Sequence, residues 1–118
     1  MVDERWPTMR HDGSVVKVIN AGLDEQVEAA VAVFGTTTRV GILRYLLKDG
    51  PAQTGAITKD LEFTRITVIK AVAALEQLGA ISADVPPDQR RGKRVMYSAD
   101  RVRIEELLKA LRGALDLT

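Results

Sequence analysis

The residues with the most distinctive chemistry stand together in one short segment, TRITVIK. Arg65 carries a planar guanidinium that can donate two parallel hydrogen bonds to one planar acceptor. Hydroxyl groups, an ammonium group and the apolar surface of two isoleucines lie within a few residues of it. This mixture suits the edges and methyl groups of nucleic acid bases, with Ile66 suited to a thymine methyl. The candidate contact residues are Thr64, Arg65, Ile66, Thr67, Ile69 and Lys70.

A second candidate group is a run of basic residues after position 86. Between positions 86 and 103 there are six Lys or Arg and two Asp, so the local charge is 6 − 2 = +4, whereas the whole chain carries +1. A solvated loop is the simplest interpretation of such a run. Cations on a short turn-rich segment can also bracket phosphates or enter a narrow groove. The candidates here are Arg90, Arg91, Lys93 and Arg94.

The sequence shows no pattern typical of an enzyme or a metal protein. It contains no cysteine, and its single histidine, His11, lies near the N-terminus. There is no glycine-rich phosphate loop and no histidine beside a serine. Glu105, Glu106 and Asp116 lack the nitrogen or sulfur partners that transition metals favour. We therefore predict a non-enzymatic protein without metal or cofactor.

Length and composition point to one small domain. A chain of 118 residues is long enough to bury a core without disulfides or metals. The absence of cysteine fits a reducing compartment. No apolar run approaches the roughly 18 residues of a membrane span, and the N-terminus lacks the layout of a signal peptide. These features predict a cytoplasmic protein with no membrane partner.

Hydrophobic spacing predicts the elements that position the candidates. Residues 1–22 show no sustained period and are predicted to form a partly disordered N-terminal arm, with a short strand within 14–20. Residues 23–118 are predicted to form the folded domain. In chain order, its expected elements are helices over 24–34, 36–49, 53–62 and 64–78, strands over 80–85 and 93–99, and a helix over 101–117.

Several side chains receive packing roles in this scheme. In the second helix, Val40 and three leucines are expected to face the core. Arg39 is expected to brace the domain or to pair with the acidic first helix. Tyr45 is expected to lie at the edge of the core, and Tyr97 to pack the second strand of the hairpin. The fourth helix is expected to bury Val68, Val72, Leu75 and Leu78.

The last helix carries more apolar surface than one small domain can cover. Ile104, Leu108, Leu111 and Leu115 step by four, three and four residues, which is a heptad-like seam. A second copy of the chain would cover it. The predicted dimer interface combines residues of the first and last helices: Leu23, Val27, Val31, Ile104, Leu108, Leu111 and Leu115.

A short helix that turns through three or four residues into a longer one is a helix-turn-helix, and a basic-tipped hairpin after it makes the motif winged. The segments TTTRVGILRYLLKDGP, TRITVIKAVAALEQLGAI and GKRVMYS resemble the second helix, recognition helix and wing strand of ArsR-type regulators, with the MarR type as a near alternative. The resemblance spans about 24 to 117. It implies a mainly α fold with a small β-hairpin, an α+β winged helix-turn-helix that dimerises through its first and last helices.

One feature departs from the family. Founding ArsR-type regulators sense metals through cysteines or through carboxylate and histidine pairs on the last helix. This chain has no such set, so a metal sensor is not expected.

The resemblance also implies a partner, which is double-stranded DNA with the recognition helix in the major groove. We expect a homodimeric repressor at an inverted-repeat operator. Two alternatives stay open, a winged-helix adaptor that contacts proteins and an architectural or replication-control DNA-binding protein. The sequence assigns no small-molecule effector.

Overall fold

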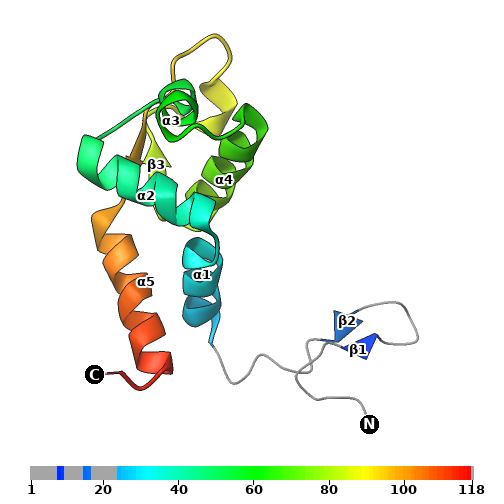
Figure 1. Ribbon diagram of the computed structural model, residues 1–118. Coiled ribbons are helices and arrows are strands. Elements are labelled where there is room, and N and C mark those ends of the chain that lie inside the picture. Colours follow the sequence, from blue (N-terminus) through cyan, green and yellow to red (C-terminus); the bar gives the residue numbers. More distant parts are fainter. Residues whose placement is uncertain (1–7, 10–14, 17–23, 118) are drawn as a thin grey trace.

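The computed structural model describes residues 8–9, 15–16 and 24–117 (Figure 1). Strand β1 (Thr8–Met9) pairs antiparallel with β2 (Val15–Val16), which agrees with the strand expected within 14–20. His11 and Leu23 lie outside the described residues, as does most of the predicted arm.

The elements of residues 24–117 follow the expected order. They are α1 (Glu25–Phe34), α2 (Thr37–Asp49), α3 (Thr54–Leu61), α4 (Arg65–Gln77), β3 (Ile81–Ala83), the 3-10 turn η1 (Pro87–Gln89), β4 (Tyr97–Ala99) and α5 (Arg101–Ala114). Figure 1 shows α1 and α5 side by side at one end of the domain, while α3 and the loop between β3 and β4 lie at the opposite end. We call that loop, residues 84–96, the wing loop.

Side-chain caps fix where the helices begin. Asp24 accepts a hydrogen bond from the backbone N–H of Val27 at 2.9 Å, and Thr36 accepts one from Arg39 at 3.1 Å. Such caps satisfy N–H groups that have no partner within the helix. Gly50 ends α2 at φ 85°, where its N–H donates to the carbonyl of Leu46. The predicted starts of the first two helices are confirmed.

The core is apolar and lies among all five helices of the described domain. Its largest fully buried side chains come from each of them: Val33, Ile42, Ile57, Val68, Leu75 and Leu107. Arg39 braces α2 against α1, because its Nη1 donates to the carbonyl oxygen of Ala32 at 2.6 Å. The predicted packing roles of Arg39 and Tyr97 are confirmed, since Tyr97 is buried in the core.

The prediction that Val40 faces the core is wrong. The chain bends by 85° between α1 and α2, so the first turn of α2 opens to solvent. Val40 there lines an open hollow of about 480 Å³ together with Phe34 and Arg44.

Among the described residues, no single helix is long and apolar enough to cross a membrane. Helices α1 and α2 meet the criteria of length and composition together, but only as this bent pair.

The hairpin is shorter than expected and gains an unpredicted neighbour. β3 and β4 pair with Ser82 opposite Ser98, and the predicted strand over 93–99 begins only at Tyr97. The chain leaves the ladder early because Pro86 and Pro87 start the 3-10 turn. Tyr97 also exchanges two backbone hydrogen bonds with Ala52, at 2.8 and 3.0 Å. The α2–α3 connection thus serves as a third, single-residue strand.

Helix α3 is held to α2 by a hydrogen bond from the Tyr45 hydroxyl to Oδ2 of Asp60, 2.6 Å long. This bond, with burial and the nearby negative charge, raises the pKa of Tyr45 to about 12. A folded-state pKa above the ordinary value of 10.0 means that this stabilisation is fully present below pH 10 and is lost as the pH rises toward 12.

Asp60→Asn should return the pKa of Tyr45 toward its ordinary value, because the amide no longer holds the phenol proton with a negative charge. Tyrosinate absorbance during an alkaline titration measures this shift. The variant should also lose the extra decline in stability between about pH 10 and 12 that the parent shows. Tyr45→Phe serves as the control, since it should remove the late-titrating group altogether. An unchanged titration in Asp60→Asn would contradict the assigned hydrogen bond.

Candidate nucleic-acid interface

Helices α3 and α4 form the helix-turn-helix, and three residues, 62–64, connect them. Glu62 adopts a left-handed backbone at φ 57°, which lets the chain reverse within this short turn. Thr64 then caps α4, and its Oγ1 accepts from the N–H of Thr67 at 3.2 Å while donating to Oγ1 of Thr67 at 2.7 Å. The turn and the cap together fix the direction in which α4 leaves the domain.

Helix α4 has one buried face and one exposed face, as the sequence predicts. Val68, Val72 and Leu75 are buried against the core, and Leu78 is partly buried. On the opposite side Ile66 is 66% exposed and Ile69 is 45% exposed. Arg65, Thr67 and Lys70 are exposed as well. The six residues expected to form the contact surface therefore lie together at the N-terminal half of α4.

A hollow of about 450 Å³ adjoins this surface, between the start of α3 and Arg65. Its lining residues are Gln53, Thr54, Gly55, Thr58, Lys59 and Arg65. Gln53 is the N-cap of α3, yet its side chain makes no capping hydrogen bond with a described residue. The first N–H groups of α3 therefore stay available to an anion. Gln53 and Thr54 are not among the residues that the sequence predicts for this surface; the signal that could have shown them is a helix start whose N-cap residue is not Ser, Thr, Asp or Asn.

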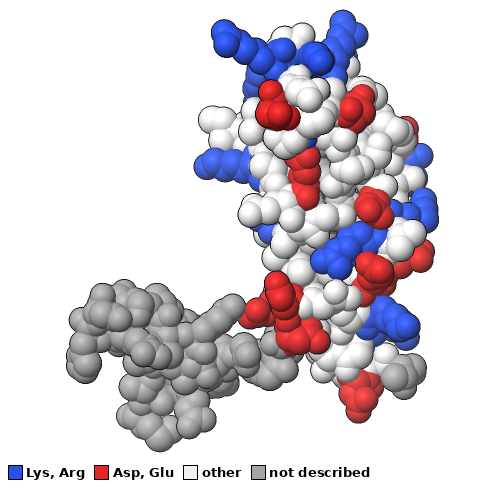
Figure 2. Space-filling view, turned by 180° about the vertical axis from the view of Figure 1, so that it is seen from behind, with Lys and Arg blue, Asp and Glu red and all other residues white. Residues whose placement is uncertain are grey.

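The wing loop carries exposed cations. Arg91, Lys93 and Arg94 are exposed, and their side chains form no hydrogen bond or ion pair with other residues of 24–117. Gly92 sits between them at φ 72°, a left-handed conformation that tightens the tip. Figure 2 shows Lys and Arg side chains projecting from the end of the molecule at which Figure 1 draws the wing loop.

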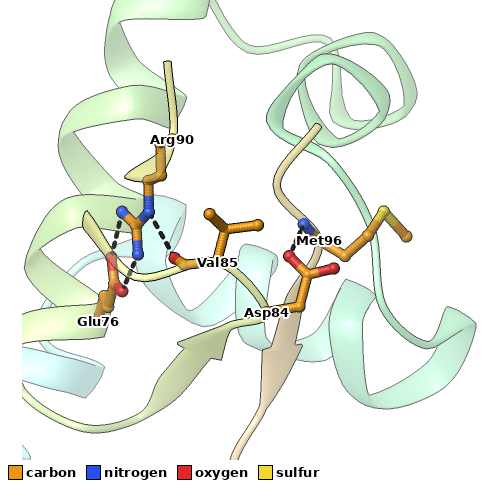
Figure 3. A network of polar contacts seen from close by, with 5 residues as sticks. All are labelled: Glu76, Asp84, Val85, Arg90 and Met96. Atoms are coloured by element: carbon orange, nitrogen blue, oxygen red, sulfur yellow. Dashed lines mark hydrogen bonds and ion pairs between the residues drawn. The ribbon is translucent and has the colours of Figure 1, made fainter. Parts of the chain in front are cut away.

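The sequence groups Arg90 with these cations, but its contacts set it apart (Figure 3). Its guanidinium pairs with both carboxylate oxygens of Glu76 on α4, at 2.5 and 3.1 Å, and its Nε donates to the carbonyl of Val85 at 2.9 Å. It also lies over the ring of Tyr97, 5.8 Å from the centroid. The bond to Glu76 raises the pKa of Arg90 above its ordinary value. Arg90 therefore attaches the wing loop to α4, and its side chain does not project from the wing loop as those of the other three cations do.

The two sides of the wing loop are joined separately. The N–H of Asp84 donates to the carbonyl of Met96 at 3.1 Å. The N–H of Met96 donates to Oδ1 of Asp84 at 2.9 Å (Figure 3). This pairing extends the hairpin by one position beyond the β3–β4 ladder. The exposed tip, residues 91–94, thus projects from a base fixed at two points.

Glu76→Ala should release the wing loop from α4, because it removes a bidentate, partly buried partner of Arg90. We expect the melting temperature to fall by about 3–6 °C. Hydrogen exchange should accelerate at the wing-loop N–H groups of Gln89 and Lys93, which bond to Pro86 and Arg90. Gln77→Ala, an exposed neighbour on the same helix, is the matched control. Equal exchange rates in both variants would contradict the role of Arg90.

Arg103 on α5 connects three helices. Its Nη1 donates to Oε1 of Gln26 on α1 at 3.3 Å, and its Nε donates to the carbonyl of Leu78, just after α4, at 3.4 Å. Glu106 lies 3.7 Å away on the same helix. One side chain thus ties the α1–α5 pair to the C-terminal end of α4.

Six of the seven residues predicted for a dimer interface are described, all but Leu23, and they divide into two groups. Val27 and Ile104 are buried in the core of their own chain, and Leu111 is partly buried against it, because α1 packs on α5 within one molecule. Val31, Leu108 and Leu115 remain exposed, the leucines at 43% and 61%. Fewer of the predicted interface residues are therefore exposed than the sequence indicates. We call Val31, Leu108 and Leu115 the α1–α5 strip.

Within the described residues, His, Asp and Glu side chains form no group of three or more that could hold a metal ion. The exposed features of 24–117 that can contact a partner include the exposed face of α4, the start of α3, the wing loop and the α1–α5 strip.

Known proteins match this structure but not its sequence. No protein-family model matches the chain, and no curated protein matches it significantly. An ArsR family transcriptional regulator superposes with a TM-score of 0.61 at 19% identity, over 79% of this chain and 90% of that one. A transcriptional regulator homologue from Pyrococcus horikoshii gives 0.53 at 22% identity, over 79% and 96%.

A MarR family regulator from Neisseria meningitidis gives a TM-score of 0.50 at 18% identity, over 69% of this chain and 56% of that one. The structural neighbours thus include both families that the sequence segments resemble. The chain has the winged helix-turn-helix fold of ArsR and MarR family transcriptional regulators.

Proposed function

We propose that this chain is a homodimeric, sequence-specific double-stranded DNA-binding protein of the cytoplasm that represses transcription at an inverted-repeat operator. The observation that carries the proposal is the exposed N-terminal half of α4, together with wing-loop cations that have no partner among the described residues. In winged helix-turn-helix proteins this half of the second helix meets base edges in the major groove.

Each exposed group has a role in this complex. Arg65 can donate two hydrogen bonds to O6 and N7 of guanine. Lys70 contacts the phosphate backbone, and Arg91, Lys93 and Arg94 bracket phosphates or enter the minor groove. The open start of α3, with Lys59, binds a further phosphate. Arg90 supports the wing loop from within.

The α1–α5 strip supplies the dimer contact. A two-fold axis through this strip brings the same leucines of both copies together. The two α4 helices then face successive turns of the major groove, roughly 34 Å apart. An operator with two inverted half-sites follows from this symmetry. Repression follows from occupation of promoter DNA.

Selection of bound duplexes from genomic fragments at two salt concentrations tests the proposal. We expect enrichment of an inverted repeat near promoters and an affinity that falls steeply as salt rises. Lack of enrichment, or binding that salt does not affect, would overturn it in favour of a protein-contact adaptor. Enriched fragments without a shared sequence would instead indicate an architectural DNA-binding protein.

A further inference from the structure

The exposed face of α4 is mostly apolar at its centre. Ile66, Ile69, Lys70 and Ala73 follow the helical spacing i, i+3, i+4 and i+7 and are all exposed. Lys70 is the one ionisable group of these four. Soluble proteins seldom expose two neighbouring isoleucines on a helix without a partner for them.

The threonines beside this row are already engaged. The Thr64 hydroxyl hydrogen donates to Oγ1 of Thr67, and the Thr64 oxygen accepts from the N–H of Thr67. The cap thus uses the hydroxyl hydrogen of Thr64, whereas the hydroxyl hydrogen of Thr67 is not donated to any described residue. Base recognition by the first two turns of α4 then depends on Arg65, on the Thr67 hydroxyl and on the apolar row.

The charge around the row identifies its partner. Arg65 and Lys70 border the isoleucines, Lys59 lies by Arg65, and the wing loop carries three further exposed cations. This apolar row, with Lys and Arg side chains around it, is complementary to an apolar group on the surface of a polyanion. In the major groove of DNA that group is the C5 methyl of thymine.

We infer that the chain reads thymine methyl groups through Ile66 and Ile69, which act as specificity-determining residues. This inference rests on the proposed function and adds to it the base chemistry of the operator. Because 5-methylcytosine presents a methyl group at the same ring position, it should bind more tightly than cytosine at the contacted positions.

The test uses a duplex recovered in the selection above, with each thymine of a half-site replaced singly by deoxyuridine. Removing a contacted methyl should weaken binding by about fourfold, the effect of leaving one methyl-sized group unburied. Replacing the matching thymines of both half-sites should weaken it by about tenfold or more. At these positions 5-methylcytosine should bind about threefold more tightly than cytosine.

Protein variants show whether the isoleucines carry the effect. Ile66→Ala or Ile69→Ala should bind thymine and deoxyuridine duplexes equally at the position that each residue contacts. Both side chains are exposed, so both variants should keep the parent's melting temperature. Val102→Ala is the matched control, because Val102 is an exposed β-branched residue on α5, and it should keep the full deoxyuridine penalty.

Three results would overturn the inference. The parent could bind all deoxyuridine duplexes as tightly as the thymine duplex. The penalty could persist unchanged in both isoleucine variants, which would place the methyl contact elsewhere. Failure to recover any bound duplex would remove the proposed function and this inference with it, whereas the first two results leave DNA binding intact.

Discussion

Replacing Arg91 and Lys93 together by alanine should weaken binding to every duplex by on the order of 30-fold at physiological salt. These side chains are exposed on the wing loop and have no partner among the described residues, so their charge is available to phosphates. A dimer would lose four cations, and the slope of log affinity against log salt should become less steep by about 2 to 4. The ranking of sequences should stay the same, because phosphate contacts carry no base information.

Arg101→Ala with Lys109→Ala is the matched control for this wing variant. Both residues are exposed on α5, outside the wing loop, and the same number of charges is removed. We expect this control to bind within about twofold of the parent and to keep its salt slope. Titration of labelled operator at three or more salt concentrations measures both quantities. Equal losses in the two variants would mean that net charge, and not the wing loop, sets the affinity.

Leu108→Asp combined with Leu115→Asp should convert the protein from a dimer to a monomer. Both leucines are exposed on the free chain, so the substitutions should not disturb the fold, but they would bury four carboxylates at the two-fold contact. Light scattering should then give the mass of one 12.9-kDa chain where the parent gives twice that value. Affinity for an operator with two half-sites should fall by about 100-fold or more.

Val102→Asp controls for the added charge. Val102 is 69% exposed, and it lies in the first turn of α5, where an acidic residue suits the helix dipole. This variant should remain a dimer and bind the operator like the parent. A dimer that persists in the double leucine variant would show that the α1–α5 strip is not the contact between copies.

The sequence predicts those parts of the fold that depend on local signals. Caps at Asp24, Thr36 and Thr64 and the glycines at 50 and 79 set most helix limits, and each acts within a few residues. The face of α4 follows from the spacing of Val68, Val72 and Leu75. These signals also explain why the candidate contact residues are found together on one exposed surface: Thr64, Arg65, Ile66, Thr67, Ile69 and Lys70.

Long-range contacts are what the sequence does not reveal. Nothing in the local pattern distinguishes Arg90 from Arg91, because the partner of Arg90 is Glu76, fourteen positions earlier. The burial of Ile104 and the exposure of Leu108 depend on how closely α1 approaches α5. Likewise, the exposure of Val40 depends on the sharp bend between two helices. Heptad spacing identifies an apolar helix but does not divide its residues between the core and a partner.

The contacts of Arg103 have a consequence for the DNA. They join the helix of the proposed dimer contact to the end of α4, so each recognition helix would keep a fixed position relative to the two-fold axis. One inserted base pair turns a half-site by about 34° and shifts it by about 3.4 Å relative to the other. Because these contacts hold α4 against the α1–α5 pair, α4 cannot turn relative to the two-fold axis to follow the displaced half-site. The protein would then discriminate between operators by the spacing of their two half-sites as strictly as by the base sequence of each half-site.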